Sequence, residues 1–214
     1  LECDGSIVWD NKGSALFYIK MNDARRPYQL YRRQIFDSNG EWINNEIQKE
    51  ELLLEEKDGV FNLICSKSFD GKFLVVQCSS KETSEMHYLD LEDPTTKHKL
   101  ECIAKRKHGV RYRVTHCRGY WLVQTNIGGL PNVCLKACRV GDEEGMTAWK
   151  DVVSSDTDLP IFDGGYQRSL DGITIFNPAV ATVDTRPFSY AVITGREEGM
   201  PRVWICEVNE EIVD

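Results

Sequence analysis

Residues 61–76 read FNLICSKSFDGKFLVV: an apolar run, a short polar turn and a second apolar run. The turn contains Asp70-Gly71, and its glycine accepts the positive φ angle that tight hairpin turns require. Aromatic and β-branched residues on both sides of the turn favour extended strands. The stretch therefore predicts an antiparallel β-hairpin.

The same pattern occurs twice more, as IVWDNKGSALFYI at residues 7–19 and as YRVTHCRGYWLV at residues 112–123. The three turn glycines recur about every 50 residues, a period typical of propeller repeats. A third and a fourth apolar run follow each hairpin. The third runs are residues 27–31, 86–91 and 133–137, and the fourth runs are residues 51–54, 100–103 and 149–153. Four strands in each repeat are the pattern of a β-propeller blade.

Two segments fit this pattern less closely. Residues 46–57 have high helix propensity, but their apolar residues are adjacent at 52–54 and do not recur at helical spacing. A short strand with a polar lead-in is the prediction there, and a helix is the alternative for the lead-in. Near the C-terminus three strands are expected, at residues 172–176, 190–194 and 202–206, with an irregular insertion at 177–187.

The expected fold class is all-β: a β-propeller fragment of about four four-stranded antiparallel blades. The blade-like repeats span approximately residues 1–58, 59–107, 108–155 and 156–214. Because the chain begins Leu1-Glu2-Cys3-Asp4, without a starting Met or a signal peptide, we expect it to be a piece of a longer protein.

Charge and hydropathy argue against two classes of partner. Lys and Arg number 26 and Asp and Glu 34, for a net charge of −8. Nucleic acid is therefore not an expected partner, because phosphate binding needs clustered positive charge. No stretch approaches the roughly 20 apolar residues of a membrane helix, so no membrane partner is expected either.

Cysteine usage favours a reducing compartment. The eight cysteines stand at positions 3, 65, 78, 102, 117, 134, 138 and 206. Several lie inside apolar runs, where a reduced cysteine acts as a small buried hydrophobe. No Asn-x-Ser/Thr sequon occurs in the sequence. Both observations indicate a cytoplasmic protein with reduced thiols.

Several stretches resemble the propeller of the prolyl oligopeptidase family of serine peptidases, and of oligopeptidase B in particular. These are RPYQLYR at residues 26–32, SFDGKFL at 68–74, GVRYRVTH at 109–116 and REEGMPRV at 196–203. Between them, Thr83-Ser84-Glu85, Leu89-Asp90, Thr125-Asn126 and Trp149 continue the match in the same order. The resemblance covers most of the chain and departs from the family at residues 35–47 and 177–187.

The resemblance implies a seven-bladed parent propeller that covers an α/β-hydrolase domain and admits only short peptides. Oligopeptidase B-like members cleave after Arg or Lys with Ser, Asp and His from the hydrolase domain. The expected function is that of the non-catalytic, substrate-gating propeller portion of such a serine endopeptidase. Its expected partners are the hydrolase domain and short peptide substrates. About four blades leave two terminal faces open, so self-association is also expected.

A stand-alone propeller scaffold that binds other proteins is the alternative function. The combined Gly-His…Trp-Asp repeat signature would favour it, and the sequence does not contain this signature. A nucleophile elbow of the form Gly-x-Ser-x-Gly is also missing from the sequence. No catalytic residue and no cofactor are therefore expected in these residues.

No metal site is expected either. Residues 98–117 contain His98, Cys102, His108, His116 and Cys117, but they lack the close ligand pairs of zinc sites. The basic run at residues 105–108 is interpreted as a solvated loop between blades.

An acidic run gives the remaining candidate site. It contains Glu50, Glu51, Glu55, Glu56 and Asp58. In a propeller channel these charges would attract peptides rich in Arg and Lys, whereas on a blade edge they would only keep the strand soluble and unpaired. The candidate substrate-channel or domain-interface residues are Glu55, Glu56, Glu85 and Arg26.

Overall fold

The structure is a computed structural model that describes residues 3–43, 50–92, 99–152, 162–176 and 189–208. Contacts divide the chain into two units, Leu1–Cys102 and Ile103–Asp214. The described residues form β-strands and one short 3₁₀ helix, η1 (Gly145–Ala148). No helix in these ranges is long and apolar enough to cross a membrane.

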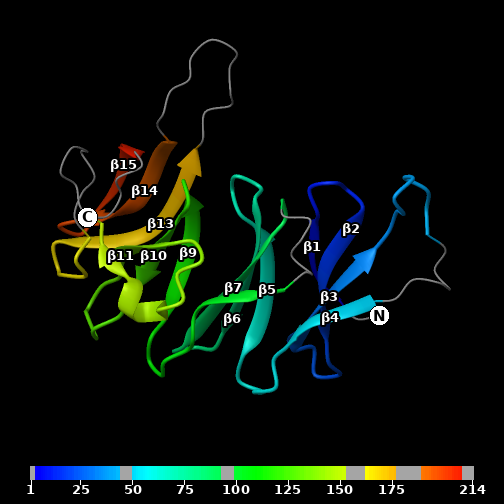
Figure 1. The fold of residues 1–214 in the computed structure, drawn as a ribbon. Coiled ribbons are helices and arrows are strands. Elements are labelled where there is room, and N and C mark those ends of the chain that lie inside the picture. The colour runs from blue at the N-terminus through cyan, green and yellow to red at the C-terminus, as the bar shows by residue number, and fades with distance from the viewer. Residues whose placement is uncertain (1–2, 44–49, 93–98, 153–161, 177–188, 209–214) are drawn as a thin grey trace, which may run out of the picture. The chain divides into compact units, whose positions relative to one another are not determined.

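The first unit contains two antiparallel sheets (Figure 1). The strands of the first, in spatial order, are β1 (Cys3–Trp9), β2 (Ala15–Met21), β3 (Pro27–Gln34) and β4 (Glu50–Glu55). Those of the second are β5 (Asn62–Lys67), β6 (Phe73–Ser79), β7 (Ser84–Asp90) and β8 (Glu101–Ala104). Each strand pairs with the next in the chain, which is the up-and-down order of a propeller blade.

The second unit contains one four-stranded and one three-stranded antiparallel sheet. The first consists of β9 (Tyr112–Cys117), β10 (Tyr120–Thr125), β11 (Cys134–Arg139) and the two-residue strand β12 (Lys150–Asp151). The second consists of β13 (Arg168–Phe176), β14 (Ser189–Glu197) and β15 (Met200–Val208). Three of the four sheets thus have four strands, and the last has three among the described residues. The three apolar runs of residues 172–206 did predict its strands.

The predicted hairpins are confirmed, and their turns show why. Gly71 has φ 77° between β5 and β6, and its N–H donates to the Ser68 carbonyl over 2.9 Å. Between β9 and β10 the turn is only Arg118-Gly119, with φ angles of 50° and 81°. Positive φ at both central residues is the type I′ geometry that matches the twist of paired strands. The predicted strand at residues 51–54 lies within β4, and its lead-in lies outside the described residues.

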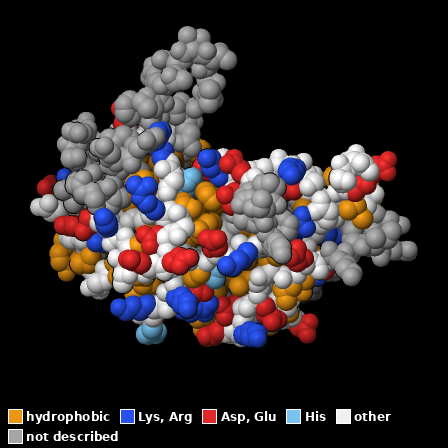
Figure 2. All heavy atoms as spheres, viewed as in Figure 1, with side chains coloured by type: hydrophobic (Ala, Val, Ile, Leu, Met, Phe, Trp, Pro, Cys, Tyr) orange, Lys and Arg blue, Asp and Glu red, His pale blue; other side chains and the backbone are white. Residues whose placement is uncertain are grey.

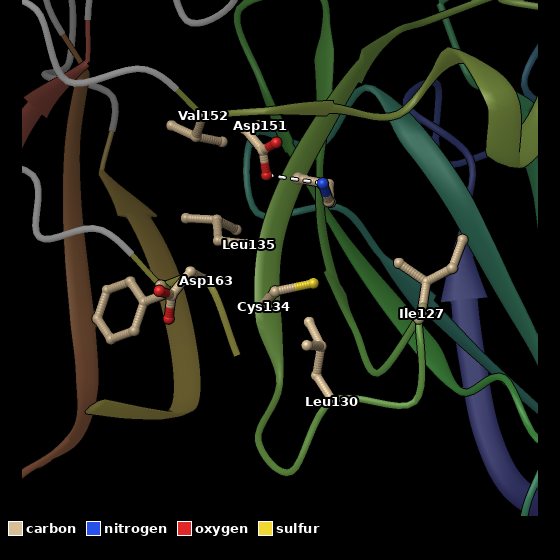
Figure 3. A pocket seen from close by; sticks show the side chains of 10 residues that line it. Ile127, Leu130, Cys134, Leu135, Asp151, Val152 and Asp163 are labelled. Atoms are coloured by element: carbon tan, nitrogen blue, oxygen red, sulfur yellow. Dashed lines mark hydrogen bonds and ion pairs between the residues drawn. The ribbon is translucent and has the colours of Figure 1, made fainter. Parts of the chain in front are cut away.

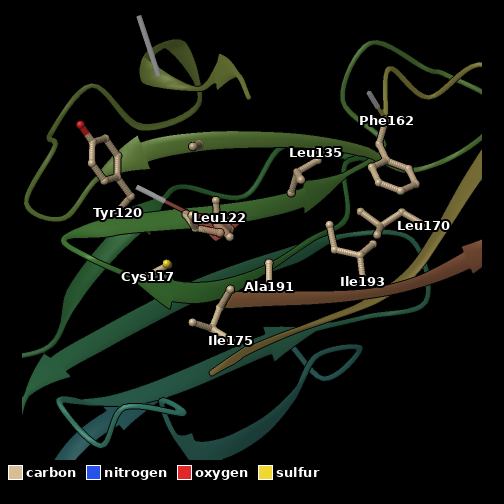
Figure 4. Close-up of a cluster of buried hydrophobic side chains, with 11 residues drawn as sticks. Cys117, Tyr120, Leu122, Leu135, Phe162, Leu170, Ile175, Ala191 and Ile193 are labelled. Atoms are coloured by element: carbon tan, nitrogen blue, oxygen red, sulfur yellow. The ribbon is translucent and has the colours of Figure 1, made fainter. Parts of the chain in front are cut away.

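Each unit has its own hydrophobic core. In the first unit alternate residues of β2, β5 and β6 meet, with Ile19, Leu63, Leu74 and Val76 fully buried. In the second unit Leu122, Leu135, Ile175 and Ile193 form the corresponding cluster (Figure 4). Because strand side chains alternate between faces, each sheet contributes one apolar face to its cluster.

Candidate functional site

The four candidate site residues all lie on or beside third and fourth strands. Arg26 directly precedes β3, Glu55 ends β4, Glu56 follows it, and Glu85 lies in β7. The first strands, β1 and β5, contact each other. In a propeller the innermost strands face the central channel, so the structure does not bring these four residues to the channel strands of this unit. Their role in a channel or at a domain interface stays a prediction.

Arg26 holds the connection between the two sheets of the first unit. Its Nη1 donates to the carbonyls of Asp58 and Phe61 over 3.1 and 2.9 Å, and its Nη2 donates to the carbonyl of Glu56 over 3.1 Å. The guanidinium also lies 5.1 Å from the centre of the Tyr28 ring. The planar fork of arginine suits this task, because it presents several donors in fixed directions.

Glu56 lies in the same connection and is buried, with 8% of its surface exposed. Its Oε1 accepts the N–H of Asp58 over 2.8 Å, and its Oε2 accepts the thiol of Cys78 over 2.8 Å. Glu55 is exposed and accepts a 2.7 Å hydrogen bond from Gln29. Arg26 and Glu56 are therefore brought together through the backbone, and Glu55 lies on the outer strand as a solvated side chain.

Glu50, another member of the acidic run, belongs to a network across three strands. It accepts hydrogen bonds from Tyr18 and Lys20 of β2, and Arg33 of β3 lies 3.8 Å away. Burial alone raises the pKa of this carboxyl, but the hydrogen bonds from Lys20 and Tyr18 outweigh burial and hold its pKa below the usual value. Burial and the Glu50 carboxylate together raise the pKa of Tyr18. The positive charges of Lys20 and Arg33 therefore balance the negative charge of the Glu50 carboxylate, which is only partly open to the solvent.

The innermost strands of the first unit form a shallow hollow of about 590 Å³ that the sequence did not indicate. It is lined by residues 5–9 of β1 and 65–67 of β5. Ile7 and Trp9 are 59% and 43% exposed there, and Lys67 donates to the Asn11 side chain over 2.8 Å. Val8 between them is buried, so Ile7 and Trp9 lie on the opposite face of β1.

A second pocket, of about 460 Å³, lies in the second unit (Figure 3). Ile127, Leu130, Leu135 and Val152 give it an apolar lining, and the 2.7 Å ion pair of Lys136 with Asp151 stands on one side. Cys134 points into it. Its pKa is raised by burial, so the thiol is protonated at neutral pH and is a poor nucleophile.

The histidines and cysteines of residues 98–117 lie in different environments. His116 is buried, and its ring nitrogen accepts the N–H of Gly119 over 3.2 Å, which supports the β9–β10 turn. Cys117 belongs to the core cluster, His108 is exposed, and His98 lies outside the described residues. The basic run at 105–108 forms the connection between β8 and β9, as predicted.

One group of potential metal ligands does occur among the described residues, and it combines Cys102 with β7. The ligand atoms of Glu85, His87 and Cys102 all lie within 4.8 Å of one another. Spacing around Cys102 in the sequence does not indicate this group, because no close ligand pair contains Cys102. The partners come from the preceding strand of the sheet.

Charged side chains of both signs are interspersed on the face that Figure 2 shows. This distribution agrees with the mildly acidic composition. It is the pattern of a solvated surface, because phosphate-binding faces concentrate Lys and Arg.

The chain is similar to a known protein family. The family described as prolyl oligopeptidase, N-terminal β-propeller domain, matches residues 1–161. The chain belongs to this family. Its four sheets are therefore blades of a β-propeller, and the predicted family and fold class are confirmed.

Similar proteins support the oligopeptidase B branch. Protease 2 of Moraxella lacunata is 30% identical over 206 residues, which are 96% of this chain and 25% of that protein. Oligopeptidase B from Leishmania major is 25% identical, with a TM-score of 0.71 over 95% of this chain and 24% of that one. Oligopeptidase B from Trypanosoma brucei with covalently bound antipain is 25% identical, with a TM-score of 0.73 over 99% and 26%. The chain thus spans about a quarter of the length of these relatives.

Proposed function

We propose that this chain is the substrate-gating, non-catalytic propeller portion of an oligopeptidase B-like serine peptidase that cleaves short peptides after Arg or Lys. Membership of the N-terminal propeller family carries the proposal. The similarity to Protease 2 and to two oligopeptidase B structures supports the choice of branch. The scaffold alternative lacks such support, since these relatives carry peptidase names.

The proposed gate is the channel face of the innermost strands. The hollow on β1 and β5 offers the exposed side chains of Ile7 and Trp9 to a passing peptide. Asp4 lies in the same strand, and its carboxylate accepts the N–H and hydroxyl of Ser6 over 2.9 and 3.0 Å. An exposed aromatic ring can pack on the aliphatic stem of a basic side chain, and a carboxylate elsewhere in the same strand attracts the positive charge of a basic peptide.

We also propose a hydrolase domain as the direct partner and the cytoplasm as the compartment. Every cysteine lies in the described residues, and all eight are present as thiols. Thiols without a disulfide framework fit a reducing compartment.

The test is a peptidase assay on the full protein with two fluorogenic substrates, a short peptide ending in Arg and a long one with the same terminal sequence. We expect cleavage of the short peptide and a strong preference for it over the long one. Trp9→Ala should shift this preference by about 2- to 10-fold, because a lost aromatic contact is worth about 0.5–1.5 kcal/mol.

The matched control is Phe69→Ala, which removes an exposed aromatic ring from the β5–β6 turn, outside the hollow. The control should keep the wild-type preference. A protein that cleaves neither substrate contradicts the peptidase assignment. A peptidase whose length preference is the same in wild type and Trp9→Ala contradicts the gate on β1 and β5 only.

A further inference from the structure

Glu85, His87 and Cys102 share one face of the second sheet. Glu85 and His87 are two residues apart in β7, so their side chains point to the same side. The hydroxyl of Tyr88 donates to Glu101 of β8, which places these two residues on the opposite side. His87 precedes Tyr88 and Cys102 follows Glu101, so His87 and Cys102 meet on the face that carries Glu85.

The three ligand atoms are already close to the spacing of a metal site. The Oε1 of Glu85 lies 3.0 Å from the Nε2 of His87, and the Sγ of Cys102 completes a group within 4.8 Å. Tetrahedral zinc with bonds of 2.0–2.3 Å holds its ligands about 3.3–3.6 Å apart. Small side-chain rotations close this difference without moving the strands.

Burial favours a ligand role over a solvated ion pair. The side chains of Glu85 and His87 are each only 13% exposed, whereas Cys102 is exposed. Packing therefore restricts the movement of the glutamate and histidine side chains. The exposed thiol leaves an entrance for the ion and a position for a water molecule.

We propose that Glu85, His87 and Cys102 bind Zn²⁺ as a three-ligand site, with water as the fourth ligand. A thiolate, an imidazole and a carboxylate are the three protein ligand types of zinc, whereas Ca²⁺ and Mg²⁺ take oxygen ligands. Binding displaces the thiol proton of Cys102 to the solvent and moves the Nε2 proton of His87 to Nδ1 or to the solvent. Two bonds to the metal then replace the hydrogen bond between Glu85 and His87.

The bound ion joins β7 to β8. β8 has only four residues and connects this sheet to the second unit. A ligand that binds only the folded state stabilises it by an amount that grows with the ratio of ligand concentration to Kd. The site therefore makes the stability of this strand pair depend on Zn²⁺.

The experiment measures Zn²⁺ binding to the metal-stripped full protein by calorimetry, and Co²⁺ binding by absorption spectroscopy. Cys102→Ser and Glu85→Gln remove ligands with little change of shape. Cys3→Ser and His108→Gln are matched controls, since both residues are exposed and lie outside the group. The thermal midpoint of each stripped variant shows that it is folded.

We expect one Zn²⁺ per chain at the site and a thiolate-to-cobalt charge-transfer band. Loss of a residue that only supports a metal ligand weakens binding by about 10–100-fold. Cys102→Ser and Glu85→Gln remove ligands themselves, so each should weaken Zn²⁺ binding by at least this amount. The controls should bind as the wild type does. The proposal is overturned if the wild type binds no Zn²⁺, if Cys102→Ser binds it equally well, or if the band is lost with Cys3→Ser instead.

Discussion

Two buried thiols have pKa values that the fold raises strongly. Burial raises the pKa of Cys65 to about 12, with a smaller contribution from Asp4. Burial also raises the pKa of Cys138 to about 12, with a contribution from Asp142. Both side chains lie in strands, and each is no more than 5% exposed. These two cysteines are therefore inert at neutral pH, while the exposed Cys3 and Cys102 are open to reagents.

The raised pKa values predict a loss of stability in alkali. Between the ordinary thiol pKa of 9.0 and about 12, the unfolded chain loses the proton and the folded chain keeps it. Stability is therefore full below pH 9 and falls as the pH rises through this window, by up to about 1.4 kcal/mol per pH unit for each thiol. Urea unfolding at a series of pH values measures the slope.

The variants Cys65→Ala and Cys138→Ala should flatten this slope, although both lower the stability at neutral pH through lost packing. Cys3→Ala is the control and should keep the wild-type slope, because Cys3 is exposed. An equal slope in all three variants would show that other groups cause the alkaline loss.

Among the elements, the connection between β4 and β5 depends on Arg26. Three backbone carbonyls of this connection accept hydrogen bonds from its guanidinium. We expect Arg26→Met to lower the free energy of unfolding by about 1–3 kcal/mol, because charge-assisted hydrogen bonds are lost. Arg26→Lys should recover only part of it, since an ammonium group cannot reproduce the fork. Urea unfolding measures both.

Lys57→Met is the control for this prediction. Lys57 is an exposed cation in the same connection, so its loss should change stability by less than about 0.5 kcal/mol. If Arg26→Met and Lys57→Met have the same small effect, the three hydrogen bonds do not stabilise the connection. The candidate role of Arg26 at a channel or domain interface would then be the better explanation of this residue.

At the scale of the whole molecule, the last sheet exposes apolar side chains on β15. Val203 and Ile205 are 64% and 69% exposed, and they alternate with Trp204 and Cys206, which face the core. Large exposed apolar surfaces favour association. We expect this 214-residue chain, expressed alone, to self-associate through this face, with a sedimentation coefficient that rises with concentration.

The double variant Val203→Lys and Ile205→Lys should abolish this concentration dependence, because two charges would be buried in the contact. Phe69→Lys places the same charge at another exposed apolar residue, and it should leave the association unchanged. A wild-type chain that sediments as a monomer at every concentration contradicts the prediction.

The strands, their turns and the family could be predicted from the sequence because these features are local. Asp70-Gly71 and Arg118-Gly119 mark hairpins through the φ angles that their glycines accept, and the flanking apolar runs supply the strands. Repetition of this unit predicted propeller blades without any knowledge of long-range contacts. The short stretches around these turns also predicted the family that the comparisons show.

Only the tertiary structure decided which side chains meet across strands and connections. Cys102 joins Glu85 and His87 because β8 lies beside β7, and a residue's partner on a neighbouring strand depends on register that spacing in the sequence does not contain. The residues next to Arg26 in the sequence do not indicate its hydrogen-bond partners. In the folded chain its guanidinium donates to three backbone carbonyls of the connection between β4 and β5. Val8 and Trp9 are neighbours in one apolar run, and only the packing of the sheets decides that Val8 is buried while Trp9 is exposed. Local preferences choose the strands, whereas the packing of sheets fixes the environment of each side chain.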